Sequence, residues 1–322
     1  MQVKYKKFSY NRYYGVELEA SPTISRDKIV KTIKKNTSRH VLSTGWQESR
    51  NNNYWHVKTD STCGSVDGME NGWEIASFKA CNSDHLREIV RVTNSLDKVG
   101  LVATDLCGLH VHVECKDFDA IGMGILLARW LKIESILAQA VPFYRRDNYY
   151  CRFQHERSYS RRRKYEPLDV WRWLKPQREW HRGNDRDKRV SLNVTNFAHA
   201  YYFESHKTNH ALTRKTIEFR FPEGTLDGRD VEGWVRLFLM FVNSSAGAKM
   251  PSDLTAVSDL DEFWSYFGLH DPRKFYILSK PILDMKSWFY NRLFVWSWRE
   301  RLRQKAVEKQ LSMSDLRPES YK

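Results

Sequence analysis

The chain has 322 residues, of which 41% are hydrophobic and 14% aromatic, a composition that suits a folded globular protein and excludes a disordered one. No stretch approaches the roughly 20 consecutive apolar residues of a membrane span, and no apolar signal-peptide core is present, so we expect a cytoplasmic protein without a membrane partner. The net charge of +14 would attract a polyanion, and the five irregularly spaced cysteines are expected to be reduced thiols.

Hydrophobic periodicity predicts a mixture of helices and strands along the chain. We expect Ser83 or Asp84 to cap the second helix and Asp117 to cap the third. In chain order, the predicted elements are a helix over about residues 27–37, strands over 54–60 and 72–76, a helix to residue 98, a strand over 108–114, a helix over 118–140, strands over 190–195 and 216–221, and helices over 230–243, 260–267 and 282–308.

A basic insertion is predicted over residues 145–189, with fifteen Lys and Arg against seven Asp and Glu. Aromatic residues interleaved with basic ones suit a nucleic-acid groove, but a solvated basic loop or a nucleotide triphosphate site has the same pattern. We expect the insertion to belong to a catalytic domain over residues 1–250. Residues 251–322 are predicted to form a helical C-terminal extension.

Three predicted strands carry charged or imidazole groups at alternate positions, with apolar residues between them. The pairs are Glu17 and Glu19, His110 and His112, and Glu218 and Arg220, and a fourth strand contributes Glu74 alone. Because the side chains of a strand alternate between its two faces, the polar groups gather on one face of the predicted sheet. The apolar face would pack beneath helices such as residues 118–140.

A sheet face exposed to solvent can be polar for no functional reason. Clustered carboxylates beside histidines, however, are costly unless cations balance them. Oxygen-rich ligands with one or two imidazoles suit Mg²⁺ or Mn²⁺, which bridge phosphate oxygens in phosphoryl transfer. Arg220 would then face the transferred phosphoryl group, and a plain ion pair with Glu218 is the alternative.

Two other site types fit the sequence poorly. Cys107, His110, His112 and Cys115 resemble a zinc ligand set, but along one extended strand the two cysteines would lie about 26 Å apart at roughly 3.3 Å per residue. A glycine-rich phosphate loop does not occur in the sequence. If ATP is bound, metals and arginines must hold it.

Taken together, these segments resemble the amidoligases, within the glutamine synthetase and glutamate-cysteine ligase superfamily of carboxylate-amine ligases. The resemblance covers about residues 11–245. It implies an α+β fold, with a curved, largely antiparallel sheet whose concave face is the active site and whose other face is covered by helices, as in the glutamine synthetase catalytic domain. The segments that carry it are Tyr14-Gly15-Val16-Glu17-Leu18-Glu19, Asp60-Ser61, Trp73-Glu74-Ile75, Gly108-Leu109-His110-Val111-His112-Val113 and Thr216-Ile217-Glu218-Phe219-Arg220.

The resemblance implies two divalent cations, Mg²⁺ or Mn²⁺. Glu17 and Glu19 would ligate different ions. Glu74 would join one of these sites, and His110 and Glu218 the other.

The resemblance also implies an ATP site. His112 would contact the phosphates, Arg220 would stabilise the phosphoryl group in flight, and Asp60 matches an acidic position that binds either metal or substrate. The resemblance also places one of Arg145 and Arg146 near the phosphates, and Arg189 with Asn193 resembles the segment before the last catalytic strand, which is implied to lie near ATP.

The implied activity is ATP-dependent amide formation between a carboxylate and an amine through an acyl phosphate, with small-molecule or peptide substrates. Two alternatives remain. The chain could be a module that binds nucleic acid or another acidic polymer through residues 145–189, or a ligase that modifies a macromolecule held on that basic surface.

Overall fold

The structure of the chain is a computed structural model that describes residues 2–43, 52–64, 70–146, 148–154, 165–174, 189–205, 215–270 and 274–308. Its elements, in chain order, are β1 (Gln2–Lys6), β2 (Tyr14–Ala20), α1 (Arg26–Asn36), β3 (Val41–Ser43), β4 (Trp55–Asp60), η1 (Ser61–Cys63), β5 (Gly72–Ala76), α2 (Ser83–Lys98), β6 (Leu109–Glu114), α3 (Ala120–Gln139), α4 (Phe143–Arg146), α5 (Pro167–Leu174), β7 (Leu192–Asn193), α6 (Thr195–Ser205), β8 (Thr216–Phe219), α7 (Gly228–Ser245), α8 (Leu260–Ser265), β9 (Lys274–Leu278) and α9 (Lys280–Glu308).

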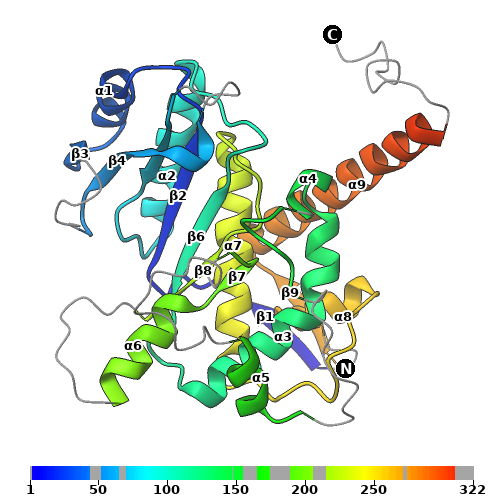
Figure 1. Ribbon diagram of the computed structural model, residues 1–322. Helices are drawn as coiled ribbons and strands as arrows, with labels where there is room; N and C mark the ends of the chain where they lie inside the picture. Colours follow the sequence, from blue (N-terminus) through cyan, green and yellow to red (C-terminus); the bar gives the residue numbers. More distant parts are fainter. Residues whose placement is uncertain are drawn as a thin grey trace.

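A seven-stranded sheet forms the centre of the molecule, in the order β3-β4-β5-β2-β6-β8-β7 (Figure 1). Every neighbouring pair in it is antiparallel except β3 and β4, which are parallel. The predicted α+β class with a largely antiparallel sheet is therefore confirmed. In a second, two-stranded sheet, β1 pairs in parallel with β9.

The apolar face of the central strands packs against α3 and α7. Phe219 of β8 stacks on Phe238 of α7 with their ring centroids 4.0 Å apart, and Trp130 of α3 lies 5.3 Å from the same ring. Val111 and Leu18 on the neighbouring strands are fully or almost fully buried in this core. Because alternate residues point the opposite way, this packing leaves the charged side chains on the other face of the sheet.

Two predicted helix caps are wrong. Asn82, not Ser83 or Asp84, caps α2, and its side chain accepts a hydrogen bond of 2.8 Å from the backbone N–H of His85. Asp119 caps α3 in the same way. In each case the cap lies three residues before the amide that it binds.

Asp117, which was expected to cap α3, instead accepts a hydrogen bond of 2.6 Å from Arg12. The competing partner comes from a segment that precedes β2, more than a hundred residues earlier in the sequence. A local pattern could not reveal it.

The pairing of β1 with β9 brings the first strand beside a segment that directly precedes α9, with Gln2 opposite Lys274, and was not predicted. The strand predicted over residues 190–195 is reduced to β7, because α6 begins at Thr195. After residue 250, the structure contains β9 as well as the helices α8 and α9. Figure 1 shows α9 running from the body of the molecule out toward the C-terminus.

Two further expectations concern the whole chain. All five cysteines are free thiols, as expected. Within the described part of the chain, none of the helices combines the length and the apolarity that crossing a membrane requires.

Candidate active site

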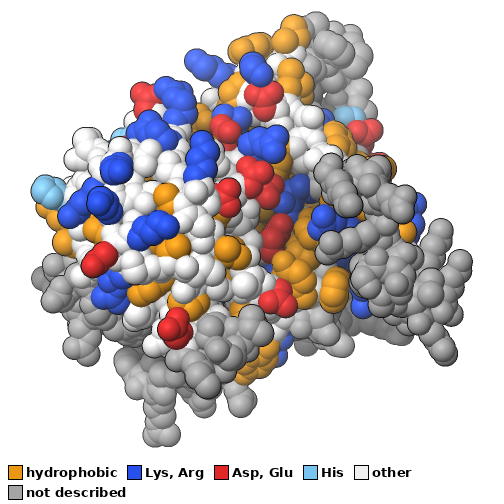
Figure 2. All heavy atoms as spheres, turned by 90° about the horizontal axis from the view of Figure 1, so that it is seen from above, with side chains coloured by type: hydrophobic (Ala, Val, Ile, Leu, Met, Phe, Trp, Pro, Cys, Tyr) orange, Lys and Arg blue, Asp and Glu red, His pale blue; other side chains and the backbone are white. Residues whose placement is uncertain are grey.

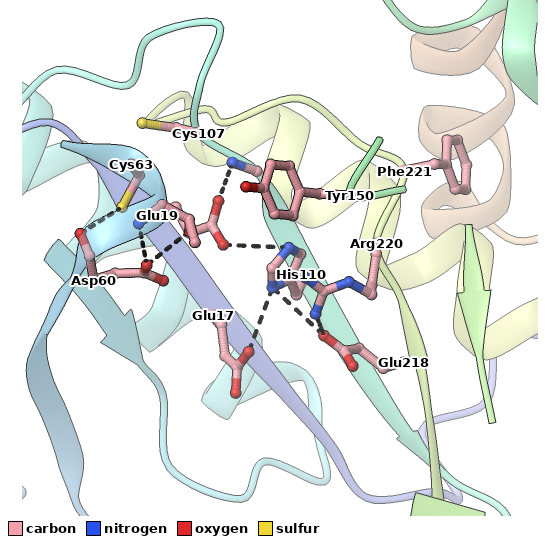
Figure 3. A network of polar contacts seen from close by, with 12 residues as sticks. Glu17, Glu19, Asp60, Cys63, Cys107, His110, Tyr150, Glu218, Arg220 and Phe221 are labelled. Atoms are coloured by element: carbon pink, nitrogen blue, oxygen red, sulfur yellow. Dashed lines mark hydrogen bonds and ion pairs between the residues drawn. The ribbon is translucent and has the colours of Figure 1, made fainter. Parts of the chain in front are cut away.

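The polar pairs of the central strands share one face of the sheet. The register places Glu17 of β2 opposite His110 of β6, and His112 opposite Glu218 of β8. Acidic side chains gather near the middle of the face seen in Figure 2, with Lys and Arg beside them. Residues from three separate strands, β2, β6 and β8, therefore meet in one charged cluster (Figure 3).

His110 is buried among three carboxylates. Its Nδ1 lies 3.5 Å from Glu17 Oε2 and 3.5 Å from Glu218 Oε1, and its Nε2 lies 3.5 Å from Glu19 Oε1. The imidazole ring thus separates the three acidic side chains and contacts each of them (Figure 3).

Glu17, His112 and Glu218 form a group that could hold a metal ion, because their ligand atoms all lie within 4.8 Å of one another. His112 Nε2 is 3.2 Å from Glu17 Oε1 and 4.0 Å from Glu218 Oε1. This nitrogen is buried and has no hydrogen-bond partner among the described residues. An imidazole nitrogen in ion-pair contact with two carboxylates fits Mg²⁺ or, with its greater tolerance of imidazole, Mn²⁺. The assignment of His112 to the ATP phosphates stays a prediction.

Glu218 is the most heavily engaged carboxylate of this group. Arg220 forms an ion pair with its Oε1, and Asn193 of β7 donates a hydrogen bond of 2.7 Å to its Oε2. Burial alone would raise the pKa of Glu218, but Arg220, His112 and His110 lower it below its ordinary value. The ion pair considered as an alternative role for Arg220 is therefore present, while the Arg220 Nε is buried without a hydrogen-bond partner among the described residues.

The electrostatics of the metal group lower the pKa values of Glu17 and Glu218 and raise that of His112. Burial would raise the pKa of Glu17, yet the nearby His112 and His110 hold it well below its ordinary value. Burial would lower the pKa of His112, but Glu17 and Glu218 raise it to about 9. Without a metal ion, the protein therefore holds a proton where a divalent cation would otherwise balance the two carboxylates.

Glu19 and Glu74 lie opposite each other on β2 and β5. Glu19 Oε2 accepts a hydrogen bond of 2.6 Å from the backbone N–H of Gly108. Glu74 Oε1 lies 2.6 Å from Nζ of Lys58, a residue of β4. Burial and the charge of Glu17 raise the pKa of Glu74 despite the attraction of Lys58. The assignment of Glu74 to a cation stays a prediction.

Lys58 was missed by the sequence analysis. Lys58 and Asp60 are two residues apart on β4, so they follow the same alternation that identified the other strands, and that signal could have found Lys58. Asp60 ends β4, and its Oδ1 accepts hydrogen bonds of 2.7 Å from both the backbone N–H and the hydroxyl of Thr62. Figure 3 shows Asp60 on the far side of Glu19 from His110.

The predicted ATP-binding arginines occupy different places. Arg145 is buried, and its guanidinium donates hydrogen bonds to the backbone carbonyls of Arg220 (2.7 Å), Phe221 (3.3 Å) and Cys107 (3.4 Å). It therefore holds the backbone of Arg220 in place. Arg146 donates a hydrogen bond of 3.1 Å to the backbone carbonyl of Val141, five residues earlier in the sequence.

Arg189 lies over the rings of Tyr149 and Tyr150, at 4.7 and 4.8 Å from their centroids. The view of the polar network in Figure 3 includes Tyr150, the ring that Arg189 contacts. The contacts of Arg145, Arg146 and Arg189 with ATP stay predictions.

Much of the basic insertion lies outside the described residues, namely positions 147, 155–164 and 175–188. The predicted contact of residues 145–189 with nucleic acid or an acidic polymer therefore stays a prediction.

Comparisons with known proteins complement this geometry. Residues 10–242 match the protein family described as "Putative amidoligase enzyme". None of the curated proteins matches the chain. Among solved structures, the chain is similar to a protein in the "Crystal structure of the complex between Prokaryotic Ubiquitin-like Protein Pup and its Ligase PafA", with 10% identity, a TM-score of 0.40, and coverage of 96% of this chain and 74% of that one. At this level the similarity assigns neither substrate nor partner.

Proposed function

The chain belongs to the amidoligase family, and from that premise we propose that it is an ATP- and Mg²⁺- or Mn²⁺-dependent carboxylate-amine ligase that forms an amide bond through an acyl phosphate. The observation that carries the proposal is the cluster on one sheet face, where Glu17, His112 and Glu218 can share a cation beside the guanidinium of Arg220. A small-molecule or peptide carboxylate and an amine are its proposed substrates.

The residues of the cluster have distinct tasks in this proposal. Glu17, Glu218 and His112 hold a divalent cation, which would supply charge neutralisation on the phosphate oxygens of ATP. Glu19 and His110 line the same face, 3.5 Å from each other, and their predicted role as further cation ligands stays a prediction. Because Glu218 is fixed by both Asn193 and Arg220, it presents its oxygens to the cation in a preorganised position.

Arg220 stabilises the phosphoryl group during its transfer. Its guanidinium lies beside Glu218. The buried Arg145 donates a hydrogen bond to the backbone carbonyl of Arg220, and this bond fixes the position of the backbone that carries the side chain. The γ-phosphoryl group passes from ATP to a carboxylate oxygen of the substrate, and ADP leaves. Positioning and charge stabilisation then account for the catalysis, as is general for phosphoryl transfer.

The second step forms the amide bond. The amine nitrogen attacks the acyl carbon, the bond from that carbon to the phosphate oxygen breaks, and inorganic phosphate leaves. We assign Asp60 to the amine, because its partly exposed carboxylate is held by Thr62 at the edge of the cluster, where it can accept the proton that the amine loses.

The experiment that tests the proposal is release of ADP and phosphate by the purified protein with ATP and Mg²⁺. It would be screened against pooled amino acids, polyamines, acidic peptides and nucleic acids. We expect amine-dependent release that is lost in Glu218→Gln, which removes a charge without changing the size of the side chain.

The matched control is Glu232→Gln, since Glu232 lies on α7 in an ion pair with Arg236 and away from the cluster. Loss of release in Glu218→Gln but not in Glu232→Gln would support the ligase. Equal release in the wild type and in Glu218→Gln would contradict it. Polynucleotide binding with steep salt dependence and without ADP release would favour a binding module instead.

A further inference from the structure

Within the proposed ligase, on which this inference rests, we propose that the ammonium group of Lys58 takes the place of the second divalent cation, so that the nucleotide-free protein binds a single divalent cation. The sequence-based prediction placed Glu74 among the ligands of one of two ions. The geometry around Glu74 points to a different arrangement, in which a side chain of the protein supplies the positive charge.

A row of three charged residues runs across the sheet beside the metal group. Lys58 of β4 lies directly opposite Glu74 of β5, and Glu74 lies directly opposite Glu19 of β2. The Lys58 Nζ is 2.6 Å from Glu74 Oε1, with 19% and 24% of the two side chains exposed. The pair is thus largely shielded from water and belongs to the same face as His110 and Glu17.

The carboxylates of this face are divided between two kinds of partner. Among the described residues, Glu17, Glu218 and His112 come within ligand distance of one another, and Glu74 is not part of that group. Glu19 Oε2 is engaged by the backbone N–H of Gly108 at 2.6 Å. One side of the face therefore offers ligand atoms to a cation, whereas on the other side Glu74 is paired with the Lys58 ammonium and one oxygen of Glu19 is occupied by a backbone hydrogen bond.

Electrostatics oppose a second divalent cation between Glu19 and Glu74. Such an ion would lie next to the Lys58 ammonium, and a divalent ion is repelled twice as strongly as a monovalent one at the same distance. Glu19 and Glu74 together carry two negative charges, one fewer than the three positive charges of a divalent ion and the Lys58 ammonium. Removing the lysine charge frees Glu74, opposite Glu19, and creates the oxygen-rich pair that a hard cation prefers.

The experiment counts Mn²⁺ ions bound to the full-length, nucleotide-free protein, with free Mn²⁺ measured by its electron paramagnetic resonance signal. We expect one bound ion in the wild type and in Lys58→Arg, which keeps the positive charge. Lys58→Met is expected to bind a second ion. Lys79→Met is the matched control, because Lys79 also pairs with a carboxylate, Glu114 at 3.6 Å, outside this row, and should leave the count at one.

Circular dichroism checks whether Lys58→Met folds. If it does not, the number of Mn²⁺ ions bound to Glu74→Gln provides an independent test. The inference requires that Glu74→Gln still binds one ion with unchanged affinity. Two ions in the wild type, one of them lost in Glu74→Gln, would overturn the inference and leave the proposed ligase intact. A count of one in a folded Lys58→Met would also overturn it. No bound ion in the wild type would overturn both the inference and the metal site of the proposed function.

Discussion

Arg292 on α9 offers a sharp test of how the C-terminal helix is held to the catalytic sheet. It is only 7% exposed, forms an ion pair with the buried Glu223, and has its Nη1 3.0 Å from Asp230 Oδ1. Its Nε also donates to the backbone carbonyl of Ala140 at 3.0 Å. Since Glu223 follows β8 closely, we expect Arg292→Met to destabilise the whole domain, not the helix alone.

The magnitude follows from the charge that the substitution leaves behind. Removing one partner of a buried ion pair typically destabilises a protein by about 3–5 kcal/mol, because the other charge remains buried without compensation. Methionine keeps the packing of the arginine stem, so loss of apolar contact adds little. Since the substitution leaves the buried Glu223 without its cationic partner, while Asp230 keeps the hydrogen bond from Trp288, we expect about 3–5 kcal/mol less free energy of unfolding.

The assay is urea unfolding followed by far-ultraviolet circular dichroism, with Arg299→Met as the matched control. Arg299 is an exposed arginine on the same helix, stacked over Trp296 at 4.7 Å, and its replacement should change the free energy of unfolding by no more than about 1 kcal/mol. If Arg292→Met loses no more than Arg299→Met at pH 8, the reasoning from buried charge is refuted.

Three further predictions follow from single contacts. A Cβ atom on Gly233 of α7 would lie 2.3 Å from Cδ2 of Trp288. Gly233→Ala should therefore lower the free energy of unfolding by about 1–3 kcal/mol, although alanine has a better helix propensity than glycine. A variant that is as stable as the wild type in urea would show that the indole ring can move. Because the pKa of His112 is raised to about 9, cation binding must displace its proton, and Mn²⁺ affinity should increase with pH up to that value. Calorimetry near pH 7, in buffers of different ionisation enthalpy, should detect the released proton. If no proton is released, His112 is not a ligand. The hydrogen bond from Arg12 lowers the pKa of Asp117, so Asp117 stabilises the fold above its ordinary pKa and loses that effect as the pH falls through the lowered value. Asp117→Asn should therefore be less stable than the wild type at pH 7. A difference in stability that persists unchanged in strong acid would contradict this origin.

Local pattern was sufficient to place the polar pairs of the site on one sheet face. Glu17 and Glu19, or His110 and His112, must point the same way in any extended strand, because the side chains of a strand alternate with a period of two. The same alternation sent Val111 and Phe219 to the helix-covered face. These features depend only on neighbouring residues, and the predicted strands 72–76 and 108–114 accordingly coincide with β5 and β6 to within one residue.

The partner of each polar group was decided by the tertiary structure. Strand register decides that Glu74 pairs with Lys58. The paths of the loops decide that the guanidinium of Arg145 donates its hydrogen bonds to backbone carbonyls of residues far away in the sequence. Asp117 shows the same limit, since Arg12 outcompetes the helix end for its carboxylate.

The sequence by itself therefore determined which residue types share a face, because that follows from the geometry of a single strand. Only the tertiary structure decided that β1 pairs with β9 and that Lys58, not a neighbouring residue in the sequence, faces Glu74. The physical reason is that a hydrogen bond or ion pair between distant segments is selected by the packing of the whole chain, which no local periodicity encodes.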